Sequence, residues 1–291
     1  MEKIGIVVDS GCDVGNVDYP LKVVPLRIFV NGKEYNDGEI DEEFLFENLD
    51  GEVKTSLPNP EAIRQVMLDF INEGYKKIIT FNISSNLSGT FNLFRLISQE
   101  LMEKFDDVKI VNIDTLNISV GSGLIVRKCI EYIHSGSLFE DVVEKSKEDI
   151  EKSKEDIEKS KVFYVIPTLK YLARGGRIGK VKAMLGEFLK MKPVISVNKE
   201  GEYYTVTKAH GFKKSINAMY EEFLKFVSNK KFISIVATTG NSESVRRIKE
   251  SLLEKIRDIE NCVRAFESEV STVLSAHTGP DLVGVAALIL D

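Results

Sequence analysis

The sequence predicts an α/β protein made of two α/β domains with parallel-rich sheets, on the basis of three observations. Short apolar runs bounded by turn residues alternate with segments whose apolar residues recur at helical spacing, which is typical of α/β architecture. The chain has 291 residues, more than the usual size of one domain. Hydrophobic residues make up 43% of it, so each domain can bury a substantial core.

The first domain is expected to begin with a strand and a hairpin. Ile4–Val8 is a continuous apolar run, typical of a buried strand. Asn31-Gly32, the strongest two-residue turn signal, predicts a hairpin between Val23–Val30 and Lys33–Tyr35. Helical spacing or a continuous apolar run defines each later element. These are a helix over Glu61–Asn72, a strand over Lys77–Phe81, a helix over Asn92–Lys104, a strand over Val108–Ile113 and a helix over Gly121–His134.

Residues 144–161 hold a near-exact duplication, EKSKEDIEKSKEDIEKSK. The apolar positions Val143, Ile150 and Ile157 recur every seven residues and give a thin stripe on an otherwise charged segment. We therefore expect a solvated connector helix here.

The domain boundary is expected at the end of a strand over Val162–Ile166, where Pro167 follows, so that the domains span residues 1–165 and 166–291. The second domain again alternates helical and apolar segments. Its expected elements are a helix near Leu169–Ala173, a glycine turn and a helix through Leu189, a strand pair over Pro193–Val197 and Glu202–Val206, a helix over Phe212–Val227, a strand over Phe232–Ala237, a helix over Glu243–Ile259, strands over Val263–Ser268 and Val273–Ala276, and a helix or strand over Asp281–Leu290.

Charge and cysteine content exclude several classes of protein. A net charge of −6 argues against a general nucleic-acid binder. Three scattered cysteines without a CxxC pair argue against a disulfide framework or a zinc site, and fit a reducing cytosol. No apolar run is long enough for a signal peptide core or a membrane span. We expect a soluble, cytoplasmic protein.

A loop rich in hydroxyl groups is the first candidate site. In the segment IITFNISSNLSGT, a short strand runs into Ser84, Ser85, Ser88 and Thr90, and a helical pattern follows. Hydroxyl groups and free backbone N–H groups at a helix start suit an anion, and the absence of lysine favours a single carboxylate over a triphosphate. An ordinary capped helix start is the alternative.

Three further segments are candidates. His277 lies where a predicted apolar strand breaks into a Gly-Pro turn, which is the usual position for ligand-binding residues in α/β folds. Thr55-Ser56 lies in a predicted turn before a helix, where capping is the alternative role. Arg174 and Arg177 flank two glycines, an arrangement that serves a ligand, a domain interface or a simple turn. No nucleophile elbow, dinucleotide fingerprint or metal-binding motif occurs, so neither a cofactor nor a metal is expected.

Taken together, these motifs resemble the DegV family of fatty-acid-binding proteins over nearly the whole chain. The order and spacing of the motifs carry the resemblance more than any single one. They are Val8-Asp9-Ser10, Val24-Pro25-Leu26, Tyr35-Asn36-Asp37-Gly38, Thr55-Ser56-Leu57-Pro58, Ser84–Thr90, Asp114-Thr115, Gly121-Ser122-Gly123, Leu169–Ile178, Lys192-Pro193 and His277-Thr278-Gly279-Pro280.

The resemblance implies a two-domain protein that encloses one long-chain fatty acid in a buried tunnel between its domains. By motif match, Thr55 and Ser88 would hold the carboxylate, and His277 would lie close to it. The same motifs add further expected ligand-binding residues. These are Ser56, Ser84, Ser85, Gly89, Thr90, Arg177 and Thr278.

The resemblance also implies a partner. In the family, the carrier presents the fatty acid to a separate kinase, which makes an acyl phosphate for phospholipid synthesis, and the carrier alone catalyses nothing. Contact with a membrane would be transient. His210 replaces an arginine linked to the kinase, and it is a candidate coupling residue together with Arg174. Asp281 replaces a glycine after the HTGP motif, and its carboxylate would repel the ligand unless it points outward.

The energies of hydrogen bonding and of apolar burial are both consistent with a fatty acid buried in the protein. Each charge-assisted hydrogen bond contributes roughly 1.5–3 kcal/mol, so several neutral donors can hold a carboxylate without a cation. Burial of the tail contributes ~0.8 kcal/mol per CH₂, so the tail dominates the affinity. Two alternatives remain open, namely an acyl hydrolase with Ser88 as nucleophile and His277 as base, and a lipid-dependent sensor or interaction protein.

Overall fold

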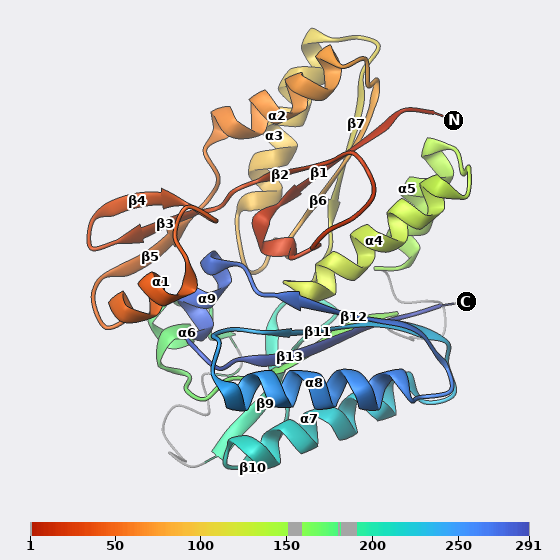
Figure 1. The fold of residues 1–291 in the computed structure, drawn as a ribbon. Helices are drawn as coiled ribbons and strands as arrows, with labels where there is room; N and C mark the ends of the chain where they lie inside the picture. The colour runs from red at the N-terminus through yellow and green to blue at the C-terminus, as the bar shows by residue number, and fades with distance from the viewer. Residues whose placement is uncertain (1, 151–158, 180, 182–190, 291) are drawn as a thin grey trace.

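Three β-sheets organise the part of the chain that the computed structural model describes, which is residues 2–150, 159–179, 181 and 191–290. A four-stranded and a three-stranded sheet come from the first half of the chain, and a six-stranded sheet comes from the remainder (Figure 1). The predicted α/β class is confirmed.

The four-stranded sheet has the order β2-β1-β6-β7 and is parallel throughout. Its strands are β1 (Ile4–Asp9), β2 (Leu21–Val24), β6 (Lys77–Asn82) and β7 (Lys109–Asp114), and a short 3-10 turn, η1 (Ser10–Cys12), follows β1. All six residues of β1 are buried, as expected for a strand covered on both faces.

Helices cover both faces of this sheet. Helices α2 (Pro60–Asn72) and α3 (Thr90–Lys104) pack on one face around Val7, Phe70 and Phe94. Helix α4 (Val120–His134) lies between this sheet and the six-stranded sheet, with α5 (Phe139–Glu148) beside it (Figure 1). The sandwiched position explains why α4 buries residues around most of its circumference.

The three-stranded sheet confirms the predicted hairpin. Strands β3 (Arg27–Val30) and β4 (Lys33–Asn36) are antiparallel, and both Asn31 and Gly32 have positive φ, as a tight hairpin turn requires. The predicted Val23–Val30 strand is split, because its first part belongs to β2. A helix and a strand that the sequence analysis did not predict complete this region. They are α1 (Glu42–Asn48), which Asp41 caps, and β5 (Val53–Ser56), which pairs with β3.

The six-stranded sheet has the order β10-β9-β8-β13-β11-β12. Its one parallel pair is β11 with β12, and the other four pairs are antiparallel. The strands are β8 (Ser160–Val165), β9 (Met191–Val197), β10 (Tyr203–His210), β11 (Phe232–Thr238), β12 (Cys262–Glu269) and β13 (Val283–Ile289). Helices α7 (Phe212–Val227) and α8 (Glu243–Arg257) cover its outer face (Figure 1).

The division into domains at residue 165 stays a prediction. Strand β8, which precedes that position, pairs with β9 and β13 in the six-stranded sheet. A division by sheet membership therefore falls before Ser160.

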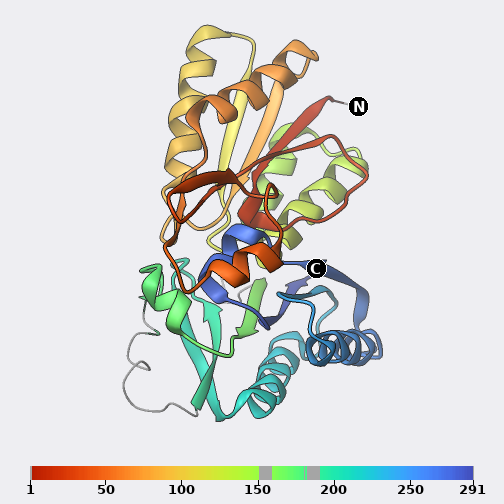
Figure 2. The ribbon, with the colours of Figure 1, turned by 60° about the vertical axis from the view of Figure 1, so that its left-hand side comes forward.

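The predicted strand over Val273–Ala276 is wrong, because these residues belong to helix α9 (Thr272–Thr278). A four-residue apolar run does not distinguish a strand from a buried helix. Two aspartate side chains from the first half of the chain support the helix start, since Asp13 accepts from the N–H of Ser271 at 3.0 Å and Asp37 accepts from the N–H of Val273 at 3.1 Å. These bonds satisfy backbone donors at the start of the helix. Figure 2 shows α9 lying beside α1, between the two halves of the molecule.

Two predictions fall outside the described residues. The duplicated segment is described only at residues 144–150, most of which belong to α5, and at residues 159–161, the last two of which begin β8. The helix predicted through Leu189 follows α6 (Lys170–Arg174), and between residues 180 and 190 only residue 181 is described. None of the helices within the described ranges has the length and apolar character that a membrane span demands.

Candidate functional site

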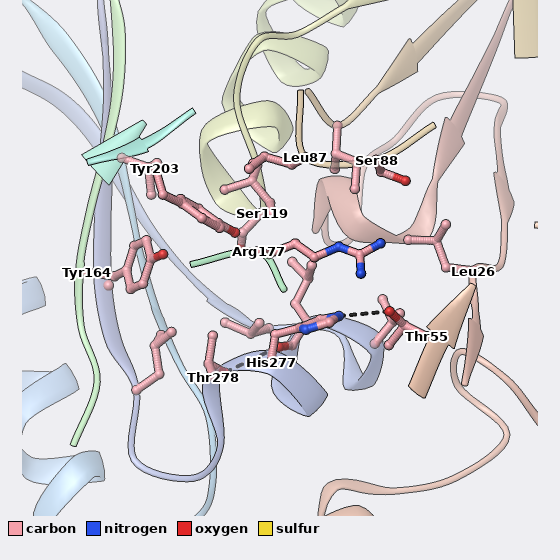
Figure 3. Close-up of a pocket in the computed structure, with 18 of the residues that line it drawn as sticks. Leu26, Thr55, Leu87, Ser88, Ser119, Tyr164, Arg177, Tyr203, His277 and Thr278 are labelled. Carbon is pink, nitrogen blue, oxygen red and sulfur yellow. Dashed lines mark hydrogen bonds between the residues drawn. The ribbon is translucent and has the colours of Figure 1, made fainter. Parts of the chain in front are cut away.

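A cavity of about 210 Å³ lies between the six-stranded sheet and the loops of the first half (Figure 3). Aliphatic side chains form most of its wall, among them Leu26, Val162, Leu274 and Leu282. Hydroxyl groups, one imidazole and one guanidinium also face it. The cavity therefore combines a large apolar surface with a few polar groups, the usual composition of a small-molecule site.

Thr55 and His277 form the central polar contact of this cavity. Thr55 lies at the end of β5 and His277 in the last turn of α9, and Thr55 Oγ1 lies 2.8 Å from His277 Nε2. Because α9 packs against β5, two residues 222 positions apart meet with hydrogen-bond geometry. Both predicted residues thus line the cavity, although His277 lies on a helix and Thr55 on a strand.

The imidazole of His277 is neutral near pH 7. Burial, assisted by the positive charges of Arg177 and Arg174, lowers the pKa of His277 to about 4. Its Nδ1 atom is buried, finds no hydrogen-bond partner among the described residues, and faces Gly175. A proton on Nε2 avoids burying an unpaired N–H group, and Nε2 then donates to Thr55. The hydroxyl hydrogen of Thr55 is left free to donate to a ligand.

Gly175 makes this arrangement possible. A Cβ atom at this position would lie 2.1 Å from Nδ1 of His277, which is far below any tolerated contact. The first glycine of the Arg-Gly-Gly-Arg segment is therefore required because the backbone approaches the imidazole closely.

The hydroxyl-rich loop divides into one residue that lines the cavity and others that shape the loop. Ser88 lines the cavity, and its Oγ lies 2.8 Å from Oγ1 of Thr90, which is buried below it. Ser84 donates to the carbonyl of Gly201 at 2.8 Å and thus ties the loop to the β9–β10 turn. The backbone N–H of Ser85 donates to Asp114. Ser84, Ser85, Gly89 and Thr90 do not line the cavity.

The remaining predicted residues take different positions. Ser56 and Thr278 line the cavity, and Thr278 also donates weakly to the carbonyl of Leu274 within α9. Arg174 donates to the carbonyls of Leu49 and Gly51 and does not line this cavity. His210 ends β10 on the exposed surface, away from the cavity.

Arg177, one of the expected ligand-binding residues, brings a positive charge to the end of the cavity that holds the neutral hydroxyl groups. Its Nη1 donates to the carbonyl of Gly175 at 2.7 Å, and its guanidinium extends toward Ser88 and Thr55 (Figure 3). The side chain lines the cavity and is exposed as well. A cation therefore stands at the same end as the hydroxyl groups.

Asp281 points away from the cavity. It has a positive φ of 64°, and its Oδ1 accepts from the hydroxyl of Ser242, the N-cap of α8, at 2.8 Å. It is absent from the cavity lining, so its charge is turned toward α8.

Sequence reasoning missed three polar residues of the lining. Ser119, Tyr164 and Tyr203 all face the cavity. Ser119 has a positive φ of 54°, and its hydroxyl donates to Asp13 at 2.5 Å. No sequence motif predicts either feature. The two tyrosines are strand residues in apolar surroundings, and only the register of the sheet shows which way they point.

The geometry does not assemble the hydrolase that Ser88 and His277 would form. Ser88 bonds to Thr90, whereas His277 bonds to Thr55, and within the described residues no carboxylate orients the imidazole. Among those residues there is also no cluster of three side chains suited to a metal ion.

Comparisons with known proteins agree with this architecture. A DegV domain-containing protein of Clostridium acetobutylicum is 39% identical over 293 residues, which cover 98% of each chain. A fatty-acid-binding DegV family protein of Thermus thermophilus superposes with a TM-score of 0.86 at 26% identity, covering 99% of both chains. The Fatty Acid Kinase B3 protein of Streptococcus pneumoniae, loaded with linoleic acid, has a TM-score of 0.85 at 25% identity and full coverage of both chains.

The family model described as "Uncharacterised protein, DegV family" matches residues 3–290. The match spans nearly the whole chain, and this chain therefore belongs to the DegV family.

Proposed function

We propose that this protein binds one long-chain fatty acid in the cavity, with the carboxylate at the end formed by Thr55, Ser88, Arg177 and His277. The observation that carries this proposal is the convergence of these polar groups on one part of a mainly apolar cavity. The fatty-acid binding named for the T. thermophilus structure and the linoleic acid named for the S. pneumoniae structure support the same ligand class.

The chemistry of the polar end suits a carboxylate. Thr55 and Ser88 offer O–H donors, and Arg177 offers a guanidinium that is still partly hydrated. Neutral His277 fixes the hydroxyl of Thr55 without adding a buried charge. The apolar wall supplies most of the affinity through burial of the tail.

We further propose that the protein is a carrier that presents this carboxylate to a separate fatty-acid kinase and has no catalytic activity of its own. A second, polar hollow of about 260 Å³ supports this role, because Thr55, Arg177 and His277 line both it and the apolar cavity. Lys54 and Arg174 also line the hollow, so cations surround the place where a phosphoryl group would approach. Three free cysteines suit the cytoplasm, where we place the protein.

Mass spectrometry of the denatured protein tests the binding proposal directly. We expect the purified protein to release one long-chain fatty acid per chain. Delipidated protein should also take up added oleate or palmitate. Protein that is empty as purified and does not bind either acid would overturn the proposal.

A reconstituted reaction tests the carrier role. With a bacterial fatty-acid kinase, ATP and the loaded protein, we expect acyl phosphate to form, trapped as its hydroxamate. The matched control is the kinase with free fatty acid alone. Binding without acyl phosphate, tested with kinases from several bacteria, would leave a lipid-dependent interaction protein as the better account. Ester hydrolysis by the protein alone, lost in Ser88→Ala, would contradict the absence of catalysis.

A further inference from the structure

Three residues from adjacent strands form one row across the sheet wall of the cavity. Gly284, near the start of β13, lies directly opposite Tyr164 of β8 on one side and Ala237 of β11 on the other. All three line the cavity. Figure 3 shows Tyr164 across the cavity from Thr55, so the row lies on the side opposite the polar groups proposed to hold the carboxylate.

The middle of this row carries almost no side chain. Gly284 and Ala237 are the smallest of the described residues that line the cavity. Larger inward-facing side chains flank them, namely Tyr164 at one end of the row and Leu282 along β13. The next inward-facing residue of β13, Ala286, is buried in the core where α4 packs on this strand, and it does not line the cavity. The wall therefore has a gap at Gly284, bounded by larger groups.

Neither backbone conformation nor packing requires a glycine at this position. Gly284 is not among the described glycines with positive φ, so its backbone conformation is open to other residues. A Cβ atom at this position would lie 3.4 Å from its nearest neighbour outside the adjacent residues, the Cβ of Tyr164, which is an ordinary van der Waals contact. The fold would therefore accept a side chain here.

Glycine inside a strand lowers the stability of the strand, and it often marks a bulge or the close approach of a ligand or another backbone. A bulge is excluded, because Gly284 pairs with both neighbouring strands without a register shift. The nearest backbone atom, the carbonyl oxygen of Phe163, would lie 3.5 Å from a Cβ atom, so the backbone does not exclude one. Close approach of a ligand in the cavity is the remaining cause.

We propose that the methyl end of the fatty acid lies against Gly284 and that this glycine sets the longest chain that the cavity accepts. This inference rests on the proposed fatty-acid binding and specifies the acid by its length. With the carboxylate held beside Thr55 and Ser88, each added methylene group extends the tail toward the sheet wall, and the gap at Gly284 leaves room for its last carbons. A longer acid meets the backbone of β13, which hydrogen bonds hold to β8 and β11.

A homologous series of saturated acids tests this inference, each acid displacing a fluorescent fatty acid from delipidated protein. For the unmodified protein we expect the affinity to rise about four-fold with each methylene group added to laurate, up to an optimum, and then to fall. In Gly284→Val the isopropyl group fills the gap, so the optimum should move to an acid about two or three carbons shorter. The acid at the former optimum should bind about ten-fold or more weakly, because the last carbons of its tail lose their place. Laurate, which is too short to reach Gly284, should bind as before.

Two matched variants keep the test independent of a folding defect. Ala237→Val adds bulk to the same row and should move the optimum in the same direction by a smaller step, so it decides the question if Gly284→Val does not fold. Ala265→Val makes the same change on β12, outside the cavity lining, and should leave the optimum where it is.

The dependence on chain length separates the possible results. An equal loss of affinity for laurate and for the longer acids in Gly284→Val would overturn the inference, as would an optimum that stays in place in both Gly284→Val and Ala237→Val. If no acid of the series binds the unmodified protein, the proposed fatty-acid binding itself is wrong, which is a different result.

Discussion

The two sides of the cavity are built by different means. On the side of Thr55 and His277, the polar groups come from the end of a strand, a loop and the last turn of a short helix, and close backbone approach fixes their positions. On the side of Tyr164 and Ala237, the wall is the face of a regular sheet, where alternate residues of paired strands point inward. If the cavity holds a fatty acid as proposed, the comparison teaches that the orientation of the acid would depend on a few irregular contacts, whereas burial of its tail would depend on a broad apolar wall.

The same substitution on the two sides should have very different effects. In Gly175→Ala the new Cβ overlaps the imidazole of His277, so the pair with Thr55 must break. We expect fatty-acid affinity to fall about ten-fold or more, because charge-assisted bonds to the carboxylate are lost. In Gly284→Ala the new methyl group lies 3.4 Å from Tyr164, an ordinary contact, and the affinity should change much less.

Isothermal titration of delipidated variants with oleate, alongside a thermal melt, measures this difference. Comparable losses at both glycines would show that the polar end has no special role.

Removing single hydroxyl groups distinguishes residues that would bind the carboxylate from residues that stabilise the loop. We expect Thr55→Ala or Ser88→Ala to weaken fatty-acid retention by up to about ten-fold without unfolding the protein, since each removes one donor to the carboxylate. The matched control is Ser84→Ala, which deletes a hydroxyl group of the same loop that bonds to Gly201 instead.

Ser84→Ala should lower stability and leave retention nearly intact. Retention is read from the lipid that copurifies with each variant. If Thr55→Ala and Ser88→Ala both held lipid as tightly as the unmodified protein, the assignment of the carboxylate to this end would be wrong.

The pH dependence of stability distinguishes the two ends of helix α9. Burial raises the pKa of Asp13, near its N-terminus, to about 8, and lowers the pKa of His277, in its last turn, to about 4. Between about pH 4 and 8 the folded state keeps the proton of Asp13, whereas the unfolded chain has released it. The free energy of unfolding that Asp13 contributes therefore falls as the pH rises through this range, and it is lost above about pH 8. His277 acts in the opposite direction, but only below its ordinary value of 6.5.

From pH 6.5 to 8 we therefore expect the free energy of unfolding to fall by roughly 1–2 kcal/mol. Asp13→Asn should flatten this dependence, because the amide does not titrate. Urea unfolding at the two pH values provides the measurement, and an unchanged slope in Asp13→Asn would exclude Asp13 as its source.

The smallest effect is expected at Asp281. Asp281→Gly relieves a positive φ but removes the bond to Ser242, so stability should change by less than about 1 kcal/mol. Fatty-acid affinity should not change, because the carboxylate points away from the cavity. A tighter complex in the variant would indicate that the charge does reach the ligand.

Sequence patterns predicted the parts of the fold that depend on local chemistry. The helix over Phe212–Val227 has the bounds expected from its apolar spacing, and Asn31-Gly32 placed the hairpin. The same patterns failed for α9, whose start bonds to the distant side chains of Asp13 and Asp37 and which packs against α1, α6 and β5. Where an element depends on contacts from the other half of the chain, its own residues do not determine it.

The candidate site shows the same limit. Turn motifs identified Thr55, Ser88 and His277, which all line the cavity, but they did not separate Ser88 from Ser84, whose side chain points to Gly201. Tyr164 carries no motif at all, because its position depends only on sheet register. Residue type and spacing thus predict which segments meet, and tertiary contacts decide which side chains face the ligand.

A crystal structure of the protein with bound stearate is the most direct test of the orientation proposed here. We expect the stearate carboxylate within hydrogen-bonding distance of Thr55 Oγ1 and Ser88 Oγ, with the tail running toward the wall formed by Tyr164 and Ala237. A carboxylate placed beside Tyr164 and Tyr203, with the tail against Thr55, would contradict the account.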